Sequence, residues 1–106
     1  MAKYLIRGSY APSGVRALIN DGGSRRREVV EQAVRSLGGS LEAFYFAFGE
    51  HDLYIIVDLP DHKAAIAASL VTNASGTVGS STSVLLLPEE VDVAAAIAVD
   101  YVPPGS

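Results

Sequence analysis

A histidine and an aspartate stand side by side in the segment FYFAFGEHDLYIIVDLP, which runs from Phe44 to Pro60. Histidine titrates near neutral pH and an adjacent carboxylate can hold its tautomer, so His51 and Asp52 are candidates for a general base and its orienting partner. Neighbours on a strand point to opposite sides, so both face one cavity only if the corner bends. The alternative is a polar turn in which Asp52 accepts hydrogen bonds from loop amides.

Arg7 is a third candidate for chemistry, because it lies in the middle of an alternating segment from Lys3 to Tyr10. An arginine inside a strand is costly unless it is paired or faces a wet cavity. If the first and third strands are neighbours, Arg7 could meet Asp52, Asp58 or an anionic ligand. An ordinary ion pair at an interface is the competing interpretation.

Aromatic side chains accompany these polar groups. Phenols such as those of Tyr10 and Tyr54 can orient a small aromatic or carbonyl compound, or stabilise an enolate by hydrogen bonding. With Phe46 and Phe48 they form the predicted ligand-binding set. More often such tyrosines are interface residues with an apolar body and one satisfied hydroxyl, so this reading stays open.

Composition excludes several classes of protein. The formal charge of -4 is unfavourable for nucleic-acid binding, which needs a basic face. The chain has no cysteine, and His51 and His62 lack metal-ligand spacing, so we expect no metal and no cofactor. The apolar runs are too short to cross a membrane, and MAKYLIRGSY lacks the apolar core of a signal peptide. A cytoplasmic protein is therefore expected.

The elements that must position these residues follow from periodicity and turn residues. Strands are predicted for residues 3–10, 40–48, 52–59 and 83–87, the last being SVLLL after a loop SGTVGSSTS. Helices are predicted through VRALIN, through RRREVVEQAVRSL with Ser24 as its cap, and through HKAAIAASLVTN after the N-cap Asp61. Pro88 is expected to start a further short helix, followed by an extended tail, VPPGS.

This order predicts an α+β, ferredoxin-like βαββαβ fold with one antiparallel sheet, as one domain over residues 1–106 with residues 88–106 as a C-terminal appendix. Two helices can cover only one face of such a sheet. If the aliphatic side of the third strand meets the helices, then Tyr54 and Ile56 point outward with Asp52 and Asp58.

The open face is therefore expected to be apolar and aromatic. In the second strand Phe44, Phe46 and Phe48 share one side, while Leu41, Ala43, Tyr45 and Ala47 share the other, and the pattern does not decide which side is open. Burying several hundred Å² at about 25 cal/mol per Å² would favour pairing of two sheets. We expect a homodimer, or a higher homo-oligomer, with a lined cavity between the sheets.

The chain resembles the GYD-domain family. The corner motif of that family, Gly-Tyr-Asp or a close variant, is matched by Gly49, His51 and Asp52, with histidine where tyrosine is common. The aromatic approach to the corner, the strand ending at Pro60–Asp61, the SLGG helix end and the late PEE are also similar. The resemblance implies a dimeric α+β barrel and very little about function, since such barrels host isomerases, monooxygenases and ligand sensors.

Two functions are compatible with these residues. The first is a homodimeric barrel that binds a small aromatic or apolar ligand, with cofactor-independent proton-transfer chemistry of an isomerase, lyase or monooxygenase-like kind if it is an enzyme. His51 or Asp52 would act as the base, and Arg7 or Tyr54 would stabilise negative charge. The second is a non-catalytic oligomerisation or assembly module.

Overall fold

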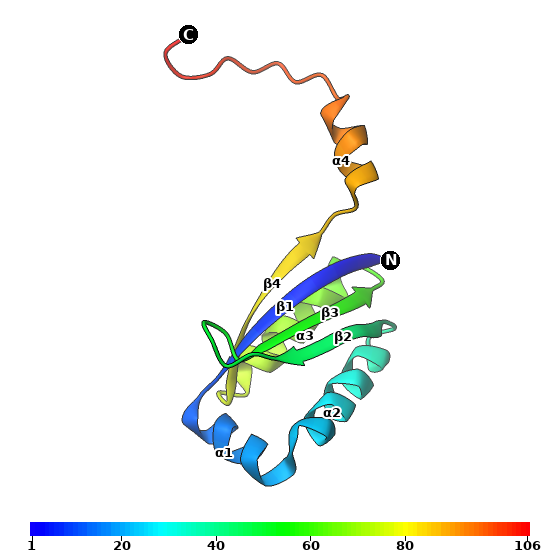
Figure 1. The fold of residues 1–106 in the computed structure, drawn as a ribbon. Coiled ribbons are helices and arrows are strands. Elements are labelled where there is room, and N and C mark those ends of the chain that lie inside the picture. Colours follow the sequence, from blue (N-terminus) through cyan, green and yellow to red (C-terminus); the bar gives the residue numbers. More distant parts are fainter.

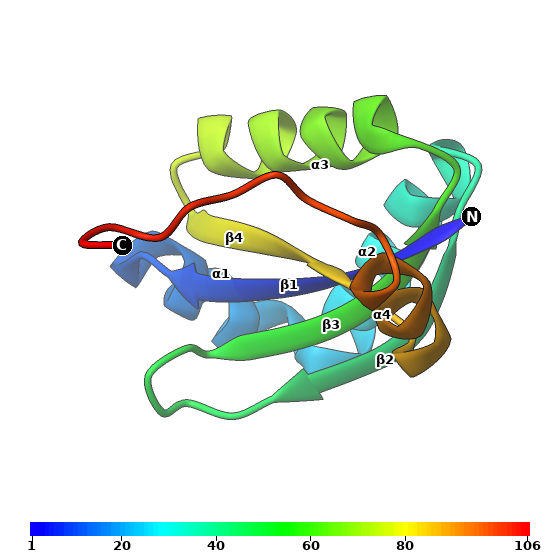
Figure 2. The same ribbon diagram turned by 90° about the horizontal axis from the view of Figure 1, so that it is seen from above.

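The computed structural model describes residues 1–106 and contains one four-stranded antiparallel sheet with helices between its strands. The elements follow in the order β1 (Ala2–Tyr10), α1 (Pro12–Asp21), α2 (Gly23–Ser36), β2 (Ser40–Phe46), β3 (Leu53–Leu59), α3 (His62–Ala74), β4 (Val78–Leu85) and α4 (Pro88–Ala95). The strand order is β2-β3-β1-β4, so β1 and β3 are central neighbours (Figure 2). The predicted ferredoxin-like α+β fold is confirmed.

The core lies on the side of the sheet that carries α2 and α3. Every second residue of β3, from Leu53 to Leu59, is buried there, and Tyr4 of β1 lies among them with 2% of its surface exposed. Val34 of α2 and Ala64 of α3 complete the core on the helix side. The hydroxyl of Tyr4 lies 3.0 Å from Nδ1 of His62, which gives this buried phenol a hydrogen-bond partner.

Local sequence explains most of the helix ends. The carboxylate of Asp61 accepts a hydrogen bond from the amide of Ala64 and caps α3, as predicted. The prediction that Ser24 caps α2 was wrong. Gly22, at φ 85°, ends α1 and begins α2 at the same time, and only glycine adopts such an angle without steric cost.

The last strand is longer than the sequence indicated. It begins at Val78 and ends at Leu85, so most of the segment predicted to be a loop is strand, and Leu86 and Leu87 lie beyond it. Serine, threonine and glycine are typical of loops, but here they form an edge strand whose backbone is paired with β1 from Lys3↔Leu85 to Tyr10↔Val78. Backbone pairing in the sheet outweighs the weak local preference.

A bulge in β2 decides which of its side chains face the helices. The register shifts between Leu41 and Ala43, so Leu41 joins Phe44 and Phe46 against the core. Strict alternation had placed Leu41 on the other side, with Ala43 and Tyr45. Ala43 and Tyr45 therefore lie on the open face, which the sequence pattern had left undecided.

The chain beyond β4 leaves the body of the molecule. Figure 1 shows α4 and the following tail extending away from the sheet, at the end opposite α1. The radius of gyration is 17.1 Å, against about 13 Å for a compact chain of this length. None of the four helices has the length and apolar character needed to span a bilayer.

Gly39 lies just after α2, where the backbone passes close to β3. A Cβ atom at Gly39 would collide with the carbonyl oxygen of Asp58 and the side chain of Leu59. The backbone of β3 would have to shift to make room, which costs stability. Gly39→Ala is expected to lower the free energy of unfolding by about 1–3 kcal/mol, measured by urea denaturation. Gly49→Ala is the matched control, because nothing lies within 4 Å of its added Cβ. Equal stabilities of the two variants would contradict this packing.

Candidate functional site

The face of the sheet opposite the helices carries the candidate site. Its residues alternate with those of the core, and they belong to all four strands. The side chains on this face that could contact a ligand or a second sheet are Leu5, Arg7, Ser9, Ala43, Tyr45, Tyr54, Ile56, Ser81, Ser83 and Leu85. Its centre is therefore apolar and aromatic, with polar groups on either side.

Arg7 lies on the central strand β1, two residues from Leu5 and nearer the corner between β2 and β3. Its cross-strand partners are Tyr54 on β3 and Ser81 on β4. One terminal nitrogen, Nη2, donates a hydrogen bond of 2.8 Å to Oγ of Ser83, whereas Nε is buried without a partner. Arg7 forms no ion pair with Asp52 or Asp58, the two carboxylates considered from the sequence. Its positive charge is thus available to an anionic group.

His51 lies next to Tyr54 on the same side of the sheet. Nδ1 of His51 is 3.3 Å from Oγ of Ser9, and the rings of His51 and Tyr54 meet edge to face with centroids 5.9 Å apart. Through the pairing of Arg7 with Tyr54, the structure brings three of the predicted residues into one cluster. Ser9 and Ser83 complete it.

Asp52 holds the corner together. Its carboxylate accepts a hydrogen bond of 2.8 Å from the amide of Tyr10, and its own amide donates to the carbonyl of Gly8. Its carbonyl accepts a hydrogen bond from the amide of Ala47. These bonds fasten the β2–β3 corner to the end of β1. No hydrogen bond joins Asp52 to His51, so the arrangement contains no histidine–aspartate pair, and the alternative of a polar structural turn describes Asp52.

Three predicted ligand-binding residues lie away from this cluster. Phe46 packs against the core on the helix side, and Phe48 stacks on it with centroids 5.7 Å apart. Phe48 adopts φ 56°, an unusual angle for a bulky residue, and its side chain is exposed. Tyr10 also lies on the helix side, in a cavity between α1 and α2. Alternation about the core sends the rings of Tyr10 in β1 and Phe46 in β2 away from Arg7, and Phe48 lies beyond the end of β2, stacked on Phe46.

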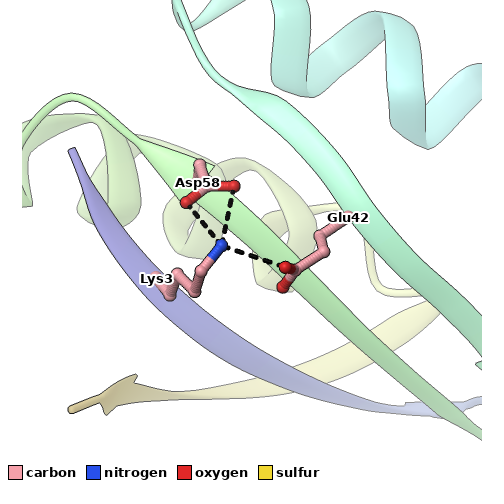
Figure 3. Close-up of polar contacts among 3 residues, drawn as sticks. All are labelled: Lys3, Glu42 and Asp58. Atoms are coloured by element: carbon pink, nitrogen blue, oxygen red, sulfur yellow. Dashed lines mark hydrogen bonds and ion pairs between the residues drawn. The ribbon is translucent and has the colours of Figure 1, made fainter. Parts of the chain in front are cut away.

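A second polar cluster occupies the other end of the open face. Nζ of Lys3 lies 3.0 Å from a carboxylate oxygen of Glu42 and 3.0 Å from one of Asp58, so three strands are joined by one ammonium group (Figure 3). The hydrogen bond to Asp58, followed by that to Glu42, raises the pKa of Lys3 above its ordinary value of 10.5. The cross-strand pairing of Lys3 with Asp58 could have been predicted from the strand order, but the contribution of Glu42 depends on the bulge in β2.

Ser81 was missed because its segment was predicted to be a loop, and Ser83 stood only at the start of the predicted strand and was given no role. Once β4 is extended to Val78, alternation alone puts Ser81 and Ser83 on the same face as Arg7. Ser9 of β1 lies on that face by the same alternation, and no role was predicted for it. No group of three or more His, Asp or Glu side chains is close enough to hold a metal ion.

The fold and this site define a class of small α+β proteins with a ferredoxin-like sheet, bare on one side. Residues 4–95 match the GYD domain family, and the chain belongs to that family. No curated protein and no solved structure matches the chain. The matched residues include the sheet, the corner motif and α4. Membership in this family does not by itself define a reaction or a ligand.

The Lys3 cluster gives a prediction in alkaline solution. Because the pKa of Lys3 is raised in the folded state, its charge stabilises the fold fully below pH 10.5, and this contribution is lost as the pH rises through the folded-state pKa. Asp58→Asn removes the largest cause, so the pKa of Lys3 should fall toward 10.5, as followed by NMR titration of the lysine side chains. Lys63, which has no ion pair, is the internal control. A Lys3 pKa unchanged by the substitution would contradict the cluster.

Proposed function

We propose that the protein is a homodimer whose two open sheet faces bind a small aromatic or apolar molecule between them. The apolar centre of the face supports this proposal. Leu5 and Ile56 are paired across β1 and β3, and Tyr45 and Tyr54 are paired across β2 and β3. Of these, Tyr45 is 71% exposed in the single chain. A second sheet would remove this surface from water, and ligand sites are usually lined in this way.

The choice of ligand rests on the environment of the Arg7 guanidinium. A half-buried guanidinium with a buried Nε and no carboxylate partner is costly unless an anionic group accepts from it. A ligand with a carboxylate, phenolate or enolate oxygen would supply that acceptor, while its ring would lie against Tyr54 and the aliphatic residues. The proposed ligand is therefore a small aromatic or apolar molecule with one anionic or carbonyl oxygen.

The chemistry that this cluster would support is proton transfer without a cofactor. His51 would act as the base, with Ser9 beside its ring nitrogen and Tyr54 against its ring. Arg7 or Tyr54 would stabilise the negative charge that develops on the ligand oxygen. Asp52 is not assigned a catalytic role, because its carboxylate is held by the amide of Tyr10.

An assembly module is the second candidate function. The same exposed surface could serve oligomerisation alone, with the Lys3 cluster placed at the edge of the contact. In that case the groups around Arg7 would fix the register of two sheets, and Arg7→Gln would change the stability of the dimer without any ligand being involved.

A panel of small aromatic carboxylates and their neutral amides separates the two candidates. Calorimetric titration is expected to show carboxylate binding that Arg7→Gln weakens about 10- to 100-fold, since a hydrogen bond to a charged group contributes about 1.5–3 kcal/mol. Binding of the amides should change much less. Lys63→Gln, on the helix side of the sheet, is the matched control for the loss of one charge. Equal affinities for wild type and Arg7→Gln, or no binding by any member of the panel, would contradict the ligand proposal.

A further inference from the structure

β4 forms one edge of the sheet, and part of its backbone has no partner on the outer side. The amide of Ser80 points away from β1 and donates a hydrogen bond of 2.9 Å to the side-chain oxygen of Asn73. Backbone groups alternate in direction along a strand, so the amides and carbonyls of Thr82 and Val84 point to the same outer side. No hydrogen bond joins them to another part of the chain there. Residues 82–84 therefore form a free edge.

The other edge of the sheet is protected where this one is open. β2 contains a bulge between Leu41 and Ala43 and carries the charge of Glu42, and both features discourage the addition of a strand. β4 pairs with β1 without a register shift and contains no charged residue. Asn73 takes the place of a neighbouring strand at Ser80 alone, where its amide nitrogen also lies 3.4 Å from the carbonyl oxygen. The free edge is thus available to an extended segment.

α3 provides the free edge with an apolar flank. Ile66 and Leu70 precede Asn73 by seven and three residues, so the three side chains share one face of the helix. That face looks toward the free edge, because Asn73 bonds to β4 from it. Ile66 and Leu70 are 57% and 66% exposed, and Val84, which lies opposite Tyr4 of the core and so on the helix side, is 51% exposed. This surface suits a strand with apolar side chains.

The C-terminal tail, defined as residues 98–102, is itself an unpaired extended segment (Figure 1). It has the sequence AVDYV and makes no hydrogen bond with the rest of the chain. Valine and tyrosine favour strands, and Val99 and Tyr101 fall on one side of an extended chain, exposed by 77% and 69%. Pro103 and Pro104 follow, and proline ends a strand because it donates no hydrogen bond to a neighbour. The tail has the length and composition of a short strand.

The tail is carried away from its own sheet. The chain leaves β4 at Leu85, and Figure 1 shows α4 and the tail extending beyond the end of the sheet. Residues 86–97 separate β4 from the tail; the eight residues of α4 span ~12 Å, and the other four add ~13 Å. This reach of ~25 Å exceeds the ~14 Å width of four strands and the ~10 Å between two packed sheets. It is long enough to bring the tail to the β4 edge of a copy that covers the open face.

We propose that the tail of a second copy adds to the free edge of β4 as a fifth strand, and that two copies exchange their tails in this way. Val99 and Tyr101 then pack against Ile66 and Leu70, and the outward backbone groups of β4 gain partners. Reciprocal exchange closes the assembly at two chains, because each copy supplies one tail and one edge. β4 is the border strand of the open face, so the tail joins beside the proposed sheet contact. Tail exchange rests on the proposed homodimer and not on its ligand.

Amide hydrogen exchange of the full chain tests the added strand. In the dimer, the amides of Thr82 and Val84 are expected to exchange at least about 10-fold more slowly than in a double variant, Asp100→Pro with Tyr101→Pro. Amide direction alternates along a strand, so one of the two amides lost from the tail faces β4. The body of the molecule is untouched by these substitutions, because the tail makes no hydrogen bond with it.

Gly105→Pro with Ser106→Pro is the matched control, because both positions lie outside the tail, and it should keep the slow exchange. Fast exchange at the free edge of the wild-type dimer would overturn the added strand. Slow exchange that survives the tail substitutions would overturn it as well, because the edge would then be paired with another strand, such as β4 of a second copy.

Mixed samples identify the copy that supplies the tail. Ser106→Cys carrying a nitroxide, in ¹⁴N protein, is mixed with ¹⁵N protein that has no nitroxide, and the chain has no other cysteine. The amides of Thr82 and Val84 are expected to lose more intensity than that of Ala43 on the opposite edge. A nitroxide on Gln32→Cys of α2 is the control for random encounters and should leave the free edge unchanged.

The outcomes separate tail exchange from the sheet dimer. A dimer with slow exchange but no loss of intensity between copies would place the tail on its own chain and overturn the exchange. A dimer with a fast-exchanging free edge would overturn the tail contact alone. A monomer would overturn both the tail exchange and the sheet dimer.

Discussion

The structure depends on one constraint: all the helices that cover the sheet lie on the same side of it. Leu53, Ile55, Val57 and Leu59 bury their side chains under α2 and α3, and the strand period then sends Tyr54 and Ile56 to the bare side. The position of Arg7 follows from the same alternation in β1. The candidate site is thus a direct consequence of how the core is packed, and any second sheet or ligand must meet this set of side chains.

Sequence alone predicted the part of this arrangement that repeats with the period of a strand. The alternation of Leu53 to Leu59 and the N-cap Asp61 gave β3, α3 and the ferredoxin-like order. Features that break this period could not be predicted from the sequence. The bulge after Leu41 moves one side chain to the other face, and pairing with β1 makes a strand of a serine-rich segment that local preference assigns to a loop. Ser81 could not be placed opposite Arg7 without that strand.

The polar residues of the corner divide into structural and accessible groups. Asp52 satisfies backbone amides and fixes the corner against β1, while His51 turns to Ser9 and Tyr54 on the bare face. Adjacent positions on the chain therefore have different tasks, as expected where a strand begins. Lys3 and Arg7 differ in a similar way. Lys3 forms ion pairs with two carboxylates, whereas Arg7 forms none.

Sedimentation equilibrium of the full chain tests the central claim most directly, namely that the bare sheet face is covered by a second copy. The account predicts a particle of twice the 11.1 kDa chain mass, and a shift toward the single-chain mass when Ile56→Glu places a charge in the middle of the face. A wild-type mass of 11.1 kDa at the highest attainable concentration would contradict it.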